Sequence, residues 1–299
     1  MKTCIVIDST FYMPEADFKK YNFKEIPLTV NFEDVTYREI RDTGAQAKEI
    51  FKKVFEQKKL PTTSQPAGSD TEKVFTEAIA EGYTKIISLH ISSELSGTTQ
   101  GVRNIAQMVM DENPGVSIQV YDSKAAAQAS GIVALEIAQI VEEDGDISEE
   151  EINNVIDYYR HNLECFFFVD SLDFLSYGGR IPASLASVGN LFGITPVLSL
   201  TDLGAIEKVR TERTAKKGLA RALEHLAKEE FTSGDDILLF GVHIENEGLT
   251  NKIVKEAKKK TNANVMYSGV SNFGIVIGNH LGPKAFGFGW VKKYERGSK

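Results

Sequence analysis

Short runs of aliphatic and β-branched residues alternate with longer amphipathic stretches through the first half of the chain. The runs that predict strands lie at residues 4–7, 26–32, 85–89 and 116–121. The clearest helical spacing, i, i+3, i+4, i+7 and i+8, belongs to Ala47, Ile50, Phe51, Val54 and Phe55. Further helices are predicted at residues 70–80, 97–110 and 125–142, the first of them begun by a capping box of Ser69 and Glu72. Strands separated by helices of this length pair in parallel, so this half predicts a three-layer α/β/α domain.

The pattern changes after an acidic helix-loop-helix passage at residues 141–162. The strands expected beyond it are a buried run at 166–169, a hairpin of 196–200 and 205–210, and runs at 237–243, 265–267 and 273–277. Helices are expected at 215–228 and 250–260. This mixed order predicts a second α/β domain with a mixed sheet, and we place the domains at residues 1–160 and 161–299.

Composition narrows the class of protein. The 299 residues are 42% hydrophobic and 25% charged, which is typical of a globular protein, and the net charge of -8 disfavours binding to nucleic acid. No apolar run approaches the roughly 20 residues of a membrane span, and the strand-like start of the chain leaves no room for a secretory signal, so we expect a cytoplasmic protein. Cys4 and Cys165 lie in apolar runs without nearby ligands at metal-binding spacing, which favours buried structural thiols.

Two hydroxyl-rich turns precede predicted helices. One contains Thr63 and Ser64 followed by Gln65 and Pro66, and the other, after the strand at 85–89, contains Ser96, Gly97 and Thr98. Hydroxyls and helix N-terminal amides can hold a small anion, and glycine allows close approach of the backbone. The alternative for each turn is a capped helix start without a ligand.

Four charged or titratable residues also follow predicted strands or glycines. Asp8 and Asp122 begin turns and receive no catalytic role, because capping is the commoner use of such residues. Arg180 follows two glycines and suits a carboxylate or phosphoryl group, with an ion pair at the domain junction as its alternative. His280 is expected at the end of the strand 273–277, fixed and partly exposed, as a donor to developing charge.

Several motifs of self-contained catalysis are missing from the sequence. It has no phosphate loop of the form G-x-x-x-x-G-K-[ST], no dinucleotide-binding G-x-G-x-x-G after a strand, no G-x-S-x-G elbow and no histidine cluster. We therefore expect no metal and no cofactor, and neither an orthodox hydrolase nor an enzyme with its own ATP site.

Taken in order, six motifs resemble the signature series of the DegV family. They are Asp8-Ser9-Thr10, Thr63-Ser64-Gln65-Pro66, Leu95-Ser96-Gly97-Thr98, Asp122-Ser123, Gly179-Arg180 and His280-Leu281-Gly282-Pro283. The resemblance extends from residue 8 to about residue 290, and the ordered set is far more specific than any one motif.

The resemblance implies a two-domain protein that binds a long-chain fatty acid, such as palmitate, stearate or oleate, in a tunnel between the domains. It implies that Thr63 and Ser96 hold the carboxylate, with Ser64, Gly97, Thr98 and His280 as further binding candidates. It also implies a partner, the catalytic subunit of a fatty acid kinase, which converts the bound acid to an acyl phosphate. Arg180 and His280 are the positions that the resemblance associates with this transfer, and no intrinsic catalytic residue is expected.

Two departures from the family pattern leave alternatives open. Lys284 follows Gly282-Pro283 where the family often has glycine, and Thr195 precedes Pro196 where it often has lysine. Neither touches the carboxylate pair, but docking to a kinase is less secure. The alternatives are a stand-alone acyl or phosphoryl transferase that uses His280, and a lipid sensor or storage module without phosphotransfer.

Overall fold

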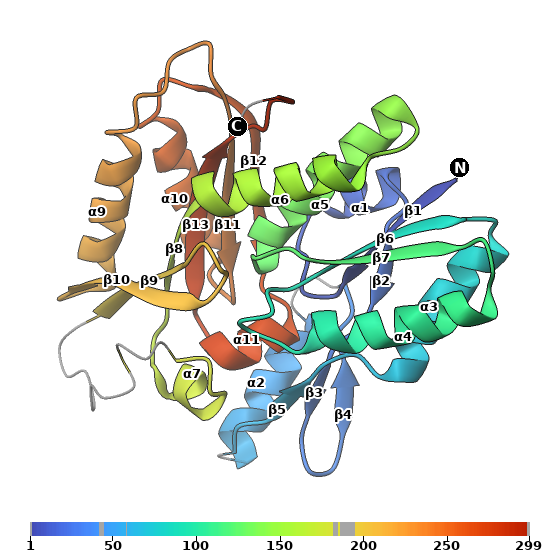
Figure 1. Ribbon diagram of the computed structural model, residues 1–299. Helices are drawn as coiled ribbons and strands as arrows, with labels where there is room; N and C mark the ends of the chain where they lie inside the picture. The colour runs from blue at the N-terminus through green and yellow to red at the C-terminus, as the bar shows by residue number, and fades with distance from the viewer. Residues whose placement is uncertain (1, 42–44, 58, 182–184, 186–194, 298–299) are drawn as a thin grey trace.

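The first of two main sheets is parallel and lies between layers of helices (Figure 1). The computed structural model describes residues 2–41, 45–57, 59–181, 185 and 195–297. The sheet has the order β2-β1-β6-β7, made by β1 (Thr3–Asp8), β2 (Lys24–Ile26), β6 (Lys85–His90) and β7 (Ser117–Asp122). Its helices are α1 (Glu15–Lys20), α3 (Gly68–Ala80), α4 (Thr98–Glu112), α5 (Ala127–Asp144) and α6 (Glu149–Asn162).

Alternation of side chains along β1 explains the three layers. Cys4 and Val6 pack in one apolar core with α3 and α4, whereas Ile5 and Ile7 pack in another with α5 and α6. Successive side chains of a strand point to opposite faces, so an unbroken apolar run is buried on both sides only between two helical layers. The α/β/α prediction for the first half is thus confirmed.

The second sheet is mixed, as the sequence predicts. Its order is β10-β9-β8-β13-β11-β12, in which only β11 and β12 are parallel neighbours. The strands are β8 (Glu164–Phe168), β9 (Thr195–Leu200), β10 (Ile206–Glu212), β11 (Asp236–His243), β12 (Asn264–Asn272) and β13 (Phe286–Lys292). The outer face of this sheet is covered by α9 (Ala215–Leu226) and α10 (Glu247–Lys258), on the left of Figure 1.

A smaller antiparallel sheet ties the two halves of the chain together. It has the order β4-β3-β5, from β3 (Thr29–Asn31), β4 (Thr36–Arg38) and β5 (Thr62–Ser64). With α2 (Ala45–Gln57), it packs against α7 (Asp173–Tyr177) and α11 (Ile275–Leu281) of the second half. The domain boundary near residue 160 falls between the two main sheets and stays a prediction.

Three local predictions are wrong. Residues 275–281 form the helix α11 instead of continuing a strand over 273–277, since a short apolar run does not by itself distinguish a strand from a buried helix. The predicted strand 26–32 is divided into β2 and β3, with Pro27 between them. Helix α3 begins at Gly68 with Ala67 as its N-cap and no side-chain cap, so the Ser69 capping box is not formed.

The central strand β13 is the main element that the sequence pattern does not reveal. Glycines weaken the strand signal of Phe-Gly-Phe-Gly-Trp at residues 286–290, because glycine disfavours strands. The structure shows why glycine is needed at two of these positions. A Cβ at Gly289 would lie 2.5 Å from the ring of Phe240, and one at Gly287 would lie 2.9 Å from the Cβ of Phe167. Both close approaches lie on the inner face of the sheet.

Candidate functional site

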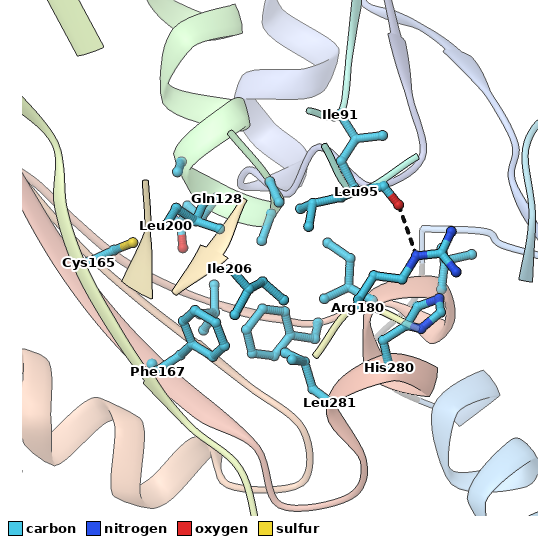
Figure 2. Close-up of a pocket in the computed structure, with 18 of the residues that line it drawn as sticks. Ile91, Leu95, Gln128, Cys165, Phe167, Arg180, Leu200, Ile206, His280 and Leu281 are labelled. Carbon is cyan, nitrogen blue, oxygen red and sulfur yellow. Dashed lines mark hydrogen bonds between the residues drawn. The ribbon is translucent and has the colours of Figure 1, made fainter. Parts of the chain in front are cut away.

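An elongated cavity lies between the inner face of the mixed sheet and the loops that follow β5, β6 and β7 (Figure 2). Its empty volume, including the part open to solvent, is about 980 Å³. Most of its wall is apolar, with Leu200, Ile206, Phe240 and Val242 among the lining side chains. Figure 2 shows Arg180 and His280 at one end, and Cys165 and Gln128 at the other. The cavity therefore has one end with polar and cationic groups and a long apolar body.

Thr63 and His280 meet at the polar end although they are 217 positions apart. The Oγ1 of Thr63 lies 2.8 Å from the Nε2 of His280. Thr63 is held by β5, which pairs with β3, and His280 lies in the last turn of α11. The packing of α11 against β3 and β5 brings the two side chains together.

The imidazole of His280 is neutral at physiological pH. Burial, with a smaller effect from the charge of Arg180, lowers the pKa of His280 from 6.5 to about 4. Its Nδ1 is buried and has no hydrogen-bond partner among the described residues. Because a buried N–H without a partner is rarer than an underused acceptor, the tautomer with its proton on Nε2 is favoured. In that tautomer His280 donates to Thr63 Oγ1, and the hydroxyl hydrogen of Thr63 is left to donate into the cavity.

Arg180 brings a positive charge to the same end. Its Nε donates to the carbonyl oxygen of Leu95 at 3.0 Å, the contact drawn in Figure 2, and its Nη1 donates to the carbonyl oxygen of Gly178 at 2.5 Å. Within the described part of the chain no carboxylate pairs with this guanidinium, so the ion pair considered from the sequence is not seen there. A half-buried cation without a paired carboxylate favours an anionic ligand nearby.

Ser96 lies in the loop between β6 and α4 and also lines the polar end. Its Oγ lies 2.9 Å from Thr98 Oγ1 and accepts from the Thr98 amide at 3.3 Å. Gly97 is the N-cap of α4, and a Cβ there would lie 3.2 Å from the side-chain oxygen of Gln65. Glycine at this position thus gives room to Gln65, which lines the cavity.

The structure brings together most, but not all, of the residues singled out in the sequence. Thr63, Ser64, Ser96, Arg180 and His280 line one cavity. Gly97 and Thr98 lie directly behind Ser96 and are not among the described lining residues, and the side chain of Thr98 is buried.

The two aspartates singled out in the sequence have structural partners. Asp122 accepts from the backbone amides of Ser93 and Lys124 and pairs with the Lys124 ammonium. Asp8 is buried beneath the site, where it accepts from the backbone amide of Ile91.

Two lining residues far from the polar end are not singled out by the sequence analysis as ligand contacts. Gln128, 2% exposed, donates from Nε2 to the hydroxyl of Tyr267 and accepts from the hydroxyl of Ser271. Cys165 is half-buried, and burial raises the pKa of its thiol to about 11. The sequence signal that could have identified Gln128 is that it is a single glutamine among small, apolar residues at the start of a helix, because buried polar side chains are uncommon.

No cluster of three or more histidine, cysteine, aspartate or glutamate side chains with the arrangement of a metal site occurs in the described part of the chain. Likewise, no described helix combines the length and apolarity that a membrane crossing requires.

Comparison with known proteins gives a consistent result. A family model described as "Uncharacterised protein, DegV family" matches residues 2–293. Protein DegV of Bacillus subtilis is 31% identical over 295 residues, which are 98% of this chain and 100% of that protein.

Solved structures agree with the sequence comparison. One from Thermus thermophilus, described as fatty acid binding of a DegV family protein, has a TM-score of 0.85 at 30% identity and covers 98% of this chain and 100% of its own. The structure of Bacillus subtilis DegV, described as a fatty acid binding protein, has a TM-score of 0.81 at 29% identity with the same coverage.

The fold and the site define a class: an α/β protein in which a parallel and a mixed sheet enclose an apolar cavity with one polar end. The matches extend over nearly the whole chain. The chain belongs to the DegV family.

Proposed function

We propose that this protein binds one long-chain fatty acid in the cavity between its two halves, with the carboxylate at the end formed by Thr63, Ser96, Arg180 and His280. The observation that carries this proposal is the cavity itself, apolar along its body and polar at one end. The related structures from Thermus thermophilus and Bacillus subtilis, described as fatty acid binding, support it.

The polar end offers enough donors for one carboxylate. The hydroxyls of Thr63 and Ser96 supply two, and the guanidinium of Arg180 supplies positive charge. Ser64 adds a hydroxyl whose oxygen accepts from the side chain of Asn31 at 2.9 Å, so its hydrogen is free to donate outward. A carboxylate that loses water needs two or three such bonds, because burying it without partners is costly.

The apolar body supplies the driving force. Burying about 14 methylenes at about 0.8 kcal/mol each gives roughly 11 kcal/mol before the costs of association and ordering. An acyl chain of 16 to 18 carbons, such as palmitate, stearate or oleate, suits a cavity of this kind.

We further propose that the bound acid is the substrate of a separate, ATP-dependent fatty acid kinase. A carboxylate oxygen attacks the γ-phosphorus of ATP, a new P–O bond forms, the bond to the bridging oxygen breaks, and ADP leaves as the acyl phosphate is made. Gln65, Gly97 and Gly179 are exposed around the polar end, which leaves that end approachable by another protein. In this scheme the chain is a carrier without its own cofactor, and Arg180 and His280 orient the carboxylate during transfer.

Mass spectrometry tests the binding proposal. The purified protein is measured under native and then denaturing conditions, and the released material is extracted into organic solvent. We expect one fatty acid per chain, released on unfolding. A protein that is empty and that also ignores added C16 and C18 acids would contradict the proposal.

A second assay tests the carrier role. The loaded protein is incubated with ATP, alone and together with a fatty acid kinase subunit. Acyl phosphate is expected only in the presence of the subunit. Robust product from the protein alone would show that it is itself the enzyme, whereas failure with the subunit would leave binding without phosphotransfer.

A further inference from the structure

A buried carboxyl, that of Glu39, lies behind the polar end of the cavity and outside the residues that line it. Glu39 directly follows β4 in the chain, and it is 2% exposed. Oε2 accepts from the hydroxyl of Ser9 at 2.7 Å. Oε1 accepts from the backbone amide of Val276 at 3.1 Å and from the hydroxyl of Tyr12 at 3.2 Å. The carboxyl therefore joins segments that are 30 and 237 positions away along the chain.

One of these contacts leads to His280. Val276 lies in the first turn of α11, and His280 lies in the last turn of the same helix. The hydrogen bond that the Val276 amide donates to Glu39 fixes where the other end of this seven-residue helix lies. The position of the imidazole in the cavity thus depends on the position of Glu39.

The other contact leads to Thr63. The Oγ of Ser9, which donates to Glu39, also accepts from the backbone amide of Leu28 at 3.0 Å. Leu28 immediately precedes β3, and in that strand Val30 is paired with Thr63 of β5. Glu39 and Ser9 together therefore fix both partners of the hydrogen bond between Thr63 and His280.

The neighbouring residue Asp8 extends the same arrangement to Ser96. Its carboxylate accepts from the backbone amide of Ile91 at 2.8 Å. Ile91 is the first residue after β6, at the start of the loop that carries Ser96. The turn beginning at Asp8, to which the sequence analysis gave no catalytic role, thus holds the backbone beneath the segments that carry Thr63 and Ser96.

Gly274 is an independent sign that the chain is built around this carboxyl. A Cβ at Gly274 would lie 1.9 Å from Oε1 of Glu39 and 2.7 Å from the hydroxyl of Tyr12. Only a glycine allows the start of α11 to approach so closely. The sequence therefore has glycine at a position where a side chain would displace Glu39 from Val276.

We propose that Glu39, acting with Ser9, is a positioning residue for carboxylate recognition, which sets the distance between Thr63 and His280 without touching the ligand. This inference rests on the proposed function and adds to it a residue that determines preference for an acid over a neutral lipid. Removal of Glu39 frees α11 to shift relative to β5, which should disturb the carboxylate donors more than the acyl chain, because most of the apolar lining residues lie outside α11.

The protonation of the Glu39 carboxyl suggests Glu39→Gln as the conservative variant. Burial raises the pKa of Glu39 to about 8, while hydrogen bonds from Ser9, Val276 and Tyr12 oppose this increase. In the protonated form Oε2 carries the proton and donates it to Ser9 Oγ, which reverses that contact, while Oε1 still accepts from Val276 and Tyr12; the amide group of glutamine can donate and accept at the same two places. Glu39→Gln is therefore expected to keep the arrangement that Glu39→Ala loses.

The test compares the affinity of the lipid-free protein for dodecanoic acid with its affinity for dodecan-1-ol by calorimetry. The wild type is expected to prefer the acid. In Glu39→Ala this preference falls by about tenfold or more, and in Glu39→Gln it stays within about threefold of wild type. Ser9→Ala, a smaller change that serves if Glu39→Ala folds poorly, lowers the preference in the same direction.

Glu136 provides a matched control. It is also a buried carboxyl whose pKa is raised by burial, and it accepts from the hydroxyl of Tyr159 at 2.9 Å, away from the cavity. Glu136→Ala should lower stability and leave the preference for the acid unchanged.

The possible failures are distinguishable. If Glu39→Ala weakens acid and alcohol equally while the wild type prefers the acid, Glu39 is merely structural and the inference is overturned, with fatty acid binding intact. If the wild type binds neither ligand, the proposed function fails, and the inference fails with it.

Discussion

The two faces of the mixed sheet are built from the same strands and have opposite properties. On the outer face Phe168, Phe288 and Trp290 are almost completely buried beneath α9 and α10. On the inner face the neighbouring positions include Cys165 and Gly287, and a cavity remains. Along β13 the outer Phe288 and Trp290 alternate with the inner Gly287 and Gly289, which gives a filled core on one side and a space for a ligand, beside Cys165 and Phe167, on the other.

The difference shows how stability and binding are divided. Because the outer face is closely packed, removing one of its large side chains leaves a cavity, and the surrounding residues lose their contacts with that side chain. The free energy of unfolding then falls. The inner face is packed less completely, and in our proposal the bound acyl chain makes the missing contacts. Substitutions on the outer face should therefore change folding, and those on the inner face should change binding.

The largest effect is expected on the outer face. Trp290→Ala removes a side chain that is 1% exposed and should lower the free energy of unfolding by about 3–5 kcal/mol. Urea denaturation of the lipid-free protein measures this change. At a temperature where the variant is folded, its affinity for palmitate should remain close to that of wild type, and a selective loss of binding would break the division between the faces.

The next effect concerns the polar end. The double substitution Thr63→Ala with Ser96→Ala removes two hydroxyl donors to a charged group, and should weaken palmitate retention by about 30-fold or more. Because neither side chain is deeply buried, stability should change by less than about 1 kcal/mol. Dialysis with radiolabelled palmitate checks the first expectation and thermal unfolding the second. Unchanged retention would remove these two residues from the carboxylate site.

A smaller effect is expected from filling the inner face. Cys165→Phe places a ring where we expect the end of the acyl chain, and displacing two or three methylenes at about 0.8 kcal/mol each lowers the affinity for stearate by about 30-fold. Dodecanoate, with a shorter chain, should be much less affected. Cys165→Ser is the control of matched size. Equal losses for long and short acids would indicate that the chain does not reach this residue.

The smallest effect is a dependence on pH. The pKa of His280 is about 4 in the folded protein and near its ordinary value of 6.5 in the unfolded chain. As pH falls through this interval the unfolded chain binds more protons, so His280 should reduce the free energy of unfolding by about 1–2 kcal/mol between pH 7 and pH 5. His280→Gln should lack this part of the decrease. Equal slopes for the two proteins would show that the imidazole titrates normally.

Much of the fold follows from the hydrophobic pattern, and the exceptions have local causes. The strands of the parallel sheet alternate with helices whose periodicity is clear, and the α/β/α order is read directly from them. The strand signal of β13 is weakened by Gly287 and Gly289, whose role depends on the close approach of the Cβ of Phe167 and the ring of Phe240. Helix α11 is too short for its period to distinguish it from a strand.

The site was predictable as a set of motifs and not as a geometry. Thr63, Ser96, Arg180 and His280 stand out in the sequence, but nothing local indicates that Thr63 and His280 share a hydrogen bond. Glu39 was not singled out, because an acidic residue in a charged stretch normally lies in solvent. Its burial follows from contacts with Ser9 and Val276 that only the folded chain provides.

The most direct test of the central claim is a crystal structure with 16-bromohexadecanoic acid, in which anomalous scattering locates the bromine. The account predicts the carboxylate within hydrogen-bond distance of Thr63 and Ser96, and the bromine near Cys165 and Gln128, at the far end of the inner face. A bromine beside Arg180 and His280, or a ligand bound elsewhere on the protein, would contradict it.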